Sequence, residues 1–226
     1  MLVLAIDTAT PAVTAGVVDL TAGSPPRLLA QRVTFNAKAH GELLIPHLAD
    51  SLAEAGRTFA EVDAIVCGAG PGPFTGLRVG LVTAAALGQA LDRPVYPVPT
   101  PDAIAIAAGT GQPLLVATDA RRREVYWAAY DASARRVDGP HVERPAELAE
   151  RLPGLHVRQA VGEGAVLYAD VLGLPVVEPH HPTPVALVAV AAQELLAGAR
   201  PAPLTPLYLR RPDAVEPVGR KKVTRA

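Results

Sequence analysis

The order of apolar runs and helical patterns is the same in the two halves of this chain. In each half three strand-like runs come first, a helical pattern follows, and strands and helices then alternate. The first half gives strands at 2–7, 12–19, 27–35, 63–67 and 95–98, and helices at 38–55, 76–91 and from 102 onward. The second half gives strands at 114–119, 124–131, 136–142, 158–162 and 176–178, and helices at 145–152, 165–172 and 184–199. The pattern predicts an α/β protein with two lobes.

A duplicated β-β-β-α-β-α unit is the layout of the actin-like ATPase superfamily, which includes actin, sugar kinases and DnaK-type chaperones. In those proteins two lobes close over a nucleotide. We therefore expect an actin-like fold with a first lobe at 1–103 and a second lobe at 104–212. The last helix of the second lobe could pack back on the first, and residues 213–226 should form a basic, flexible tail.

Composition narrows the class of protein further. Half of the 226 residues are hydrophobic and 19% are charged, which suits a folded domain. The formal net charge is −1, so the chain has no excess of positive charge for tight nucleic-acid binding. If RNA is handled, a partner should supply most phosphate contacts. The single cysteine, Cys67, excludes an internal disulfide. The longest near-apolar stretch, 79–91, is shorter than a membrane span of about 18 residues, so we expect a cytoplasmic protein.

The first predicted hairpin turn carries residues that could hold phosphate. Asp7 ends a short apolar strand, and Thr8 and Thr10 follow in the turn. Successive backbone N–H groups in a tight turn can form an anion site, and an aspartate at this place could organise magnesium. An ordinary Asx turn explains the same residues.

The second predicted hairpin turn and a later Gly-x-Gly complete this candidate nucleotide site. The turn starts at Asp119 and carries three arginines, Arg121 first, where nucleotide clamps of this fold place glycines. Gly162 and Gly164 precede a helix where adenosine could be cradled, although an ordinary strand-to-helix turn would look alike. Because the arginines would prevent a close backbone cradle, we expect a degenerate nucleotide site.

A stripe of small residues marks the second helix. Gly76, Gly80, Ala84 and Gly88 recur every four residues. Glycine inside a helix costs about 0.5–1 kcal/mol relative to alanine, so another backbone should approach the stripe closely. Either the stripe packs inside its own lobe or a partner helix lies across it, and we expect the partner.

The sequence offers no evident catalytic or metal-binding cluster. His40 and His47 lie seven residues apart, which is not a common ligand spacing, and the pair at 180–181 has no cysteine or carboxylate cluster beside it. No serine lies in a nucleophile elbow. We expect no metal, no cofactor and no catalytic residue. A stand-alone actin-like kinase or transferase and an M22-type peptidase are the alternatives.

Four segments in this order resemble the TsaB (YeaZ) family over nearly the whole chain. They are residues 7–10, 70–80, 119–128 and 206–210, with Pro73 where serine is usual. The resemblance implies an actin-like fold and a non-catalytic paralogue of TsaD, the enzyme that transfers a threonylcarbamoyl group to the adenosine beside the transfer RNA anticodon. TsaD holds a metal partly through a His-Met-Glu-Gly-His segment. Here Thr100 and Ile104 stand in place of its two histidines.

The resemblance also implies partners. The chain should bind TsaD through the helices at 38–55 and 76–91, act with TsaE, and meet transfer RNA only through the complex. In isolation it could pair with itself. The residues expected at the TsaD interface are His40, Leu44, His47, Gly76, Gly80, Thr83, Ala84 and Gly88.

Overall fold

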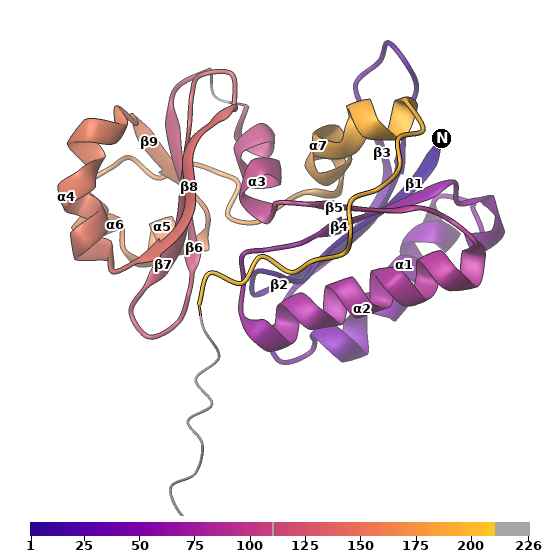
Figure 1. Ribbon diagram of the computed structural model, residues 1–226. Helices are drawn as coiled ribbons and strands as arrows, with labels where there is room; N and C mark the ends of the chain where they lie inside the picture. The colour runs from indigo at the N-terminus through magenta and orange to yellow at the C-terminus, as the bar shows by residue number, and fades with distance from the viewer. Residues whose placement is uncertain (110, 211–226) are drawn as a thin grey trace, which may run out of the picture.

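The first lobe is a five-stranded sheet covered by helices on both faces. The computed structural model describes residues 1–109 and 111–210 (Figure 1). The strands are β1 (Leu2–Asp7), β2 (Ala12–Asp19), β3 (Arg27–Phe35), β4 (Ala64–Gly68) and β5 (Val95–Val98). They lie in the order β3-β2-β1-β4-β5, with antiparallel β1–β2 and β2–β3 pairs and parallel β1–β4 and β4–β5 pairs. Because both faces are covered, β1, β2 and β4 are apolar almost throughout.

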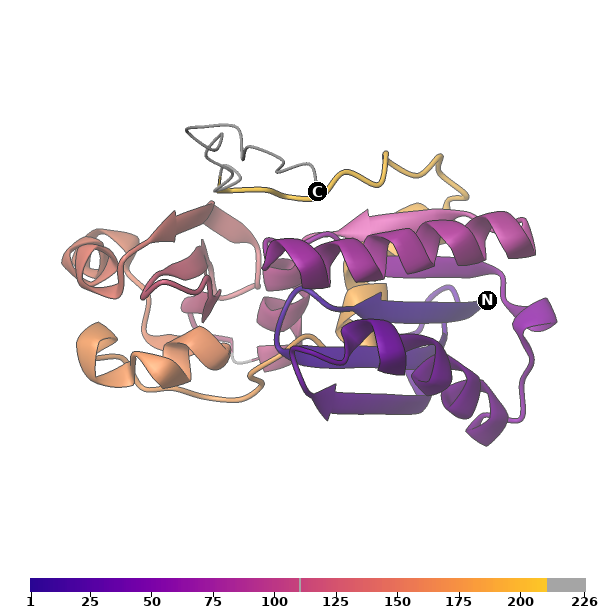
Figure 2. The ribbon, with the colours of Figure 1, turned by 90° about the horizontal axis from the view of Figure 1, so that it is seen from below.

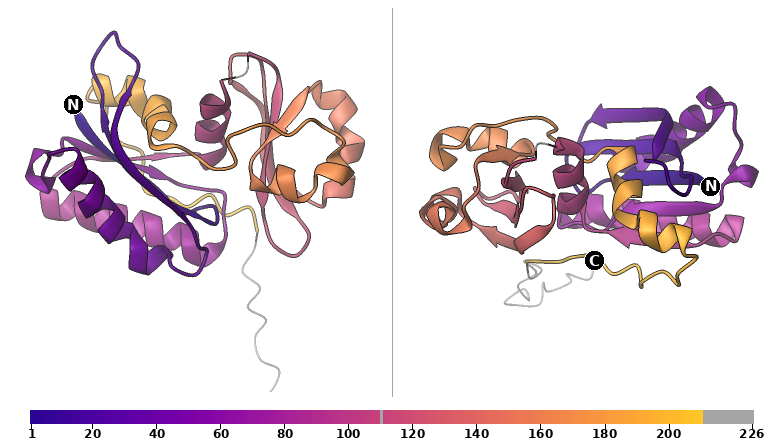
Figure 3. Two further views of the ribbon diagram at one scale, coloured as in Figure 1. Left: turned by 180° about the vertical axis from the view of Figure 1, so that it is seen from behind. Right: turned by 90° about the horizontal axis from the view of Figure 1, so that it is seen from above.

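Different helices cover the two faces of this sheet. On one face α1 (His40–Glu54) and α2 (Phe74–Leu91) pack over the largest apolar core, and the 3-10 helix η1 (Phe59–Glu61) precedes β4. On the other face lie α3 (Thr100–Ala108) and α7 (Pro184–Leu196), which pack on β1, β4 and β5 (Figure 3). The last helix of the second half of the sequence therefore contributes to the core of the first lobe.

The second lobe repeats this order of strands with fewer elements. Its strands are β6 (Leu114–Asp119), β7 (Val125–Tyr130), β8 (Arg136–Glu143) and β9 (Gln159–Val161), in the order β8-β7-β6-β9. One face is covered by α4 (Pro145–Leu155), α5 (Glu163–Leu167) and α6 (Ala169–Leu172). α3 packs against the other face, where Ile104 and Ala105 join a core cluster with residues of β6 and β7. α3 thus lies between the two sheets.

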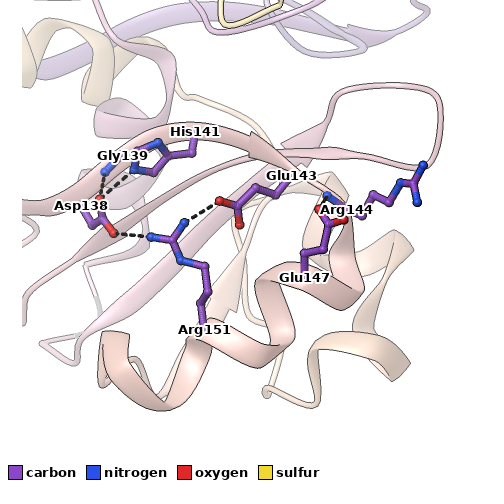
Figure 4. A network of polar contacts seen from close by, with 7 residues as sticks. All are labelled: Asp138, Gly139, His141, Glu143, Arg144, Glu147 and Arg151. Atoms are coloured by element: carbon purple, nitrogen blue, oxygen red, sulfur yellow. Dashed lines mark hydrogen bonds and ion pairs between the residues drawn. The ribbon is translucent and has the colours of Figure 1, made fainter.

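A polar network attaches α4 to β8 on the outer side of the second lobe (Figure 4). The Arg151 guanidinium contacts Glu143 at 2.5 Å and Asp138 at 3.2 Å, and lies over the ring of Trp127 at 4.9 Å. The Nε2 atom of His141 is 2.8 Å from the other oxygen of Asp138. These contacts hold the helix against the sheet beside the buried tryptophan.

The C-terminal strap, residues 201–210, crosses from the first lobe to the second alongside α2 (Figure 2). Leu204 and Leu207 pack against the core under α1 and α2. The Leu207 N–H donates to the carbonyl oxygen of Ala69 at 2.9 Å. At the far end, Arg210 donates to the carbonyl oxygen of Ala120 at 3.1 Å and pairs with Glu124.

Two predicted elements differ in kind from those of this fold. The predicted strand at 176–178 is reduced to one parallel bridge between Ala160 and Val176. The predicted helix at 165–172 is two short helices, α5 and α6, which meet at Tyr168 with φ −121°. The expected lobe boundary at residue 103 falls inside α3, and the expected basic tail at 213–226 lies outside the described residues.

Candidate functional site

Hydrogen bonds close the β1–β2 turn off from solvent. Asp7, Thr8 and Thr10 are each at most 2% exposed. The Thr8 hydroxyl donates to the carbonyl oxygen of Gly76 at 2.7 Å, and Nε2 of His40 lies 3.0 Å from the carbonyl oxygen of Thr10. Burial lowers the pKa of His40, so its neutral form is favoured. The Thr8 hydroxyl, which the sequence offered to phosphate, is thus engaged within the lobe.

Asp7 is held by its own turn and by α3. Its Oδ1 accepts the Ala9 N–H at 2.9 Å, and its Oδ2 accepts the Thr100 hydroxyl at 2.6 Å. A Cβ at Gly68 would lie 1.7 Å from Oδ2, so only glycine fits at the end of β4. Burial raises the pKa of Asp7 to about 6, against the opposing effect of the Thr100 hydrogen bond. The carboxyl group therefore joins β1 to the start of α3.

The small-residue stripe of α2 packs on this same turn, so the expected partner helix across it is wrong. A Cβ at Gly76 would lie 2.6 Å from the carbonyl oxygen of Thr8, and one at Gly80 would lie 2.5 Å from the Thr8 hydroxyl. A Cβ at Gly88 would lie 2.4 Å from a side-chain atom of β5. Ala84 is fully buried in the core under α1 and α2. The close backbone approach that the glycines allow is made by the protein's own hairpin.

The other expected interface residues are divided between core and surface. Leu44 and His40 are buried, at 1% and 7% exposure, so they too are wrong as contact residues on an open surface. His47 is half-buried and its Nε2 lies 2.9 Å from the Thr34 hydroxyl. Thr83 is half-buried and faces the surface groove described below.

The β6–β7 turn is exposed and has an unusual backbone. Arg121, Arg122 and Arg123 have φ of 62°, 56° and 62°, the left-handed region that favours glycine. The Arg121 N–H donates to Asp119 Oδ1 at 2.8 Å, and its guanidinium contacts Oδ2 at 3.1 Å. The Glu124 N–H donates to the Arg121 carbonyl oxygen at 3.0 Å. The turn keeps a glycine-like path while carrying three long cationic side chains.

Glu163 is a buried carboxylate that the sequence reasoning missed. Its Oε1 accepts the Asp119 N–H at 3.2 Å, and its Oε2 has no hydrogen-bond partner among the described residues. Burial raises its pKa to about 8, to which the negative charges of Asp119 and Asp7 add. A Cβ at Gly162 would lie 2.3 Å from the Ala117 carbonyl oxygen, so the glycines beside Glu163 serve close packing on β6. The only signal was a carboxylate between two glycines.

The outward face of α2, away from the small-residue stripe, carries exposed apolar side chains. Val82 is 67% exposed and Phe74 is 46% exposed. The ring of Phe74 stacks on Tyr208 of the C-terminal strap at 5.4 Å, and the Arg78 guanidinium lies 3.6 Å above the Phe74 ring. A surface groove on this face is lined by Phe74, Thr75, Arg78, Val79, Val82 and Thr83.

The length of α2 corrects another expectation. The apolar helix is 18 residues long and begins at Phe74, five residues before the stretch that was expected to be too short for a membrane. Among the described residues it is the one helix whose length and composition alone would allow a membrane crossing. Its buried side packs on β4 and α1, so we assign it to the first lobe.

The two residues that the sequence analysis placed opposite a pair of histidines are both used within the fold. Thr100 and Ile104 lie on α3 and are fully buried. The Thr100 hydroxyl is engaged by Asp7, and Ile104 packs in the core cluster on the second sheet. Within residues 1–109 and 111–210, no group of three or more His, Cys, Asp or Glu residues is arranged to hold a metal ion.

Comparisons with known proteins agree in pointing to one family. Residues 34–194 match the family described as TsaD, tRNA N6-adenosine threonylcarbamoyltransferase. An uncharacterized protein of Mycobacterium tuberculosis is 51% identical over 94% of this chain and 93% of its own length. The tRNA threonylcarbamoyladenosine biosynthesis protein TsaB of Escherichia coli is 33% identical over 58% of this chain and 55% of its own length. The structure of YeaZ from Pseudomonas aeruginosa aligns with a TM-score of 0.74 at 27% identity, covering 92% of this chain and 99% of that one.

Proposed function

Because the chain belongs to the TsaD family, and within it to the TsaB (YeaZ) proteins, we propose that it serves tRNA threonylcarbamoyladenosine biosynthesis as a non-catalytic subunit. Its role would be to hold a TsaD-type catalytic subunit in its active arrangement, with TsaE as a further component. Transfer RNA would be reached through that complex, and the complex would work in the cytoplasm.

The observation that carries this proposal is the pair of residues at the start of α3. Isoleucine has no atom that ligates a metal, and the hydroxyl of Thr100 is used by Asp7 at 2.6 Å. A Lewis acid at this place would have neither of the two histidine ligands that the family's enzyme supplies. The chain's contribution to the reaction is then a change in the population of an active complex rather than bond-making.

The two lobes are proposed to be an actin-like duplication, residues 1–103 and 104–212, with a degenerate nucleotide site between them. Asp7, Thr8 and Thr10 are closed within the first lobe, and Arg121 occupies the position of a clamp glycine in the second. We expect ATP to bind the isolated chain with a dissociation constant of about 0.1 mM or weaker, which is roughly −5.5 kcal/mol.

The outward face of α2 is proposed as the surface that meets the TsaD-type subunit. It presents exposed apolar side chains, Phe74 and Val82, with Thr83 in its groove. His47 on α1 is the other residue of the expected interface that is not buried. An exposed apolar patch of this kind on a small protein is typical of an interface. When the partner is absent, the same surface would pair two copies of the chain.

Two other functions would need features that the described residues argue against. A stand-alone kinase or transferase would need an open phosphate cradle, and the β1–β2 turn uses its hydroxyl groups internally. An M22-type peptidase would need metal ligands or an activated nucleophile, and the one cysteine, Cys67, is buried with its pKa raised by burial, so its thiolate is disfavoured.

The test is reconstitution from purified subunits with threonylcarbamoyl-adenylate and transfer RNA. This chain alone should yield no modified nucleoside by mass spectrometry, the set with TsaD and TsaE should yield it, and omission of this chain should abolish it. Val82→Glu should keep the melting transition and lose the partner on size-exclusion chromatography, because it places an unpaired charge in the interface. Val137→Glu, on β8 and 58% exposed, is the matched control that should bind normally. Modification by this chain alone, or full turnover without it, would refute the proposal.

A further inference from the structure

We infer that the tip of the β6–β7 hairpin, with Arg123 and the neighbouring Arg144, forms a contact surface for the phosphate groups of RNA. The inference rests on the proposed function, and it adds a direct contact to the phosphate contacts that a partner was expected mostly to supply. The surface belongs to the second lobe, and neither arginine has a role in the packing described above.

The backbone of the tip is the first observation. Three consecutive non-glycine residues hold positive φ, between 56° and 62°. A left-handed conformation is unfavourable for residues with a Cβ, and single residues rather than runs usually adopt it. Strain of this kind collects at functional sites, where the surrounding structure keeps it in place. Here the hydrogen bonds from Arg121 to Asp119 and from Glu124 to Arg121 hold the strained path.

The balance of charge at the tip is the second observation. Asp119 is paired with Arg121, and Glu124 is paired with Arg210 of the C-terminal strap. The carboxylates of the turn are therefore already neutralised by other arginines. Arg123 has an exposed side chain, and no carboxylate in the described part of the chain forms an ion pair with it.

Arg144 extends the same cationic surface. It directly follows β8, whose Glu143 pairs with Val125 at the start of β7, so it lies beside the turn. Its backbone N–H donates to Glu147, and the nearby Glu143 is engaged by Arg151. In Figure 4 the side chain of Arg144 points away from both of those contacts. Within residues 1–109 and 111–210, no carboxylate forms an ion pair with its guanidinium.

The tip also lies next to the proposed partner surface. Tyr208 stacks on Phe74 at the start of α2, and Arg210, two residues later, binds the carbonyl oxygen of Ala120 in the turn. Two residue steps of extended chain span roughly 7 Å. The tip therefore lies close to the surface proposed to meet the subunit that would hold the RNA.

Arginine at such a place suits phosphate. The planar guanidinium presents several N–H groups in a geometry that matches phosphate oxygens, and it stays charged at all relevant pH values. Contacts of this kind position an RNA without reading its sequence. A chain with a net charge of −1 would add only a local share of the phosphate contacts, which is what two arginines can provide.

The test uses the assembled complex with TsaD and TsaE and an unmodified transfer RNA transcript. In Arg123→Glu/Arg144→Glu the KM for transfer RNA should rise about tenfold at 0.1 M salt, with kcat and complex formation unchanged. The slope of the logarithm of the binding constant against the logarithm of the salt concentration should become shallower by about one to two, because about one to two phosphate contacts are lost. The matched control is Arg135→Glu/Arg158→Glu, which makes the same charge change on exposed arginines at the opposite end of the same sheet. Its KM should change less than twofold.

The remaining outcomes decide against the inference. An equal rise in KM for both double variants would show only a long-range effect of net charge. An unchanged KM, or weaker ATP binding by the isolated chain with RNA binding unaffected, would also overturn it. If the wild-type complex makes no modified nucleoside, the proposed function fails. The inference is then decided separately by the anisotropy of labelled transfer RNA added to the chain–TsaD complex.

Discussion

The two hairpin turns occupy equivalent places in the two sheets and have opposite surroundings. The β1–β2 turn carries Thr8 and Thr10, which are at most 2% exposed, and it is covered by the glycines of α2. The β6–β7 turn is built from arginines, is exposed, and is held by short-range ion pairs and by Arg210. One turn has become part of a core, and the other is available at the surface.

The difference shows that the same supersecondary unit can be stabilised in two ways. In the first lobe, α2 supplies a smooth backbone face, and the turn gains packing and hydrogen bonds from it. In the second lobe, the short α5 takes the place of α2, and glycine packing occurs at Gly162 and Gly164 behind the turn instead. The tip of the second hairpin is therefore uncovered, and its cationic side chains can contact a partner.

The largest expected effect comes from disrupting the contact between α2 and the first turn. Gly76→Val/Gly80→Val should lower the free energy of unfolding by about 4 kcal/mol or more, because both side chains would overlap Thr8 in a packed core. Urea denaturation followed by circular dichroism measures this loss. Gly41→Val/Gly154→Val is the matched control, since a Cβ at either position meets nothing within 4 Å. A similar loss in the control would show that the effect does not come from overlap with Thr8.

An intermediate effect is expected behind the second turn. Burial raises the folded-state pKa of Glu163 from 4.5 to about 8, so the ionised carboxylate destabilises the fold, and stability is lost as pH rises between these values. Glu163→Gln keeps an acceptor for the Asp119 N–H and stays neutral. It should raise the free energy of unfolding by about 2 kcal/mol at pH 9 and change it little at pH 5.

Thermal melts of both proteins from pH 5 to pH 9 measure this difference. The exposed residue Glu150, on α4, supplies the control substitution Glu150→Gln, which makes the same chemical change at the surface. A Glu163→Gln difference that stays constant between pH 5 and pH 9 would contradict burial of a titrating carboxylate behind the turn.

The smallest effect is expected at the tip of the second turn. Arg123→Gly should raise the free energy of unfolding by about 0.5 kcal/mol, because glycine relieves the left-handed strain while adding freedom to the unfolded chain. Arg135→Gly, in the next turn along the chain, should instead lower it. Chemical denaturation measures both changes. If Arg123→Gly proves destabilising, the tip is not strained. Backbone strain would then no longer distinguish the β6–β7 turn from the β1–β2 turn.

Strands and helices of strong periodicity could be predicted from the sequence. The bounds of β1, β2, β3, β5 and β6 agree with the predicted ranges, because each is a short apolar or alternating run between turn residues. The match to TsaB and YeaZ relatives confirms the assignment made from four short segments. The breaks around Tyr168 and the single bridge at Val176 were not predictable, because short apolar stretches carry too little periodicity.

The candidate site was predicted less completely. The spacing of Gly76, Gly80 and Gly88 correctly indicated a close backbone approach, but it could not say which backbone approaches. The protein's own Thr8 is 68 residues away from Gly76 in the sequence, and no local pattern records that contact. For the same reason the burial of Glu163 and the pairing of Arg210 with Glu124 could not be read from neighbouring residues.

The C-terminal strap has a mechanical consequence for motion between the lobes. Its two anchors, the N–H of Leu207 on Ala69 and the guanidinium of Arg210 on Ala120, are three residues apart. Three extended residues reach roughly 10 Å, so the strap acts as a short tether between the lobes, beside α3. A rotation that separates the lobes further must first release one anchor. Truncation before Leu207 should therefore widen the range of interlobe angles.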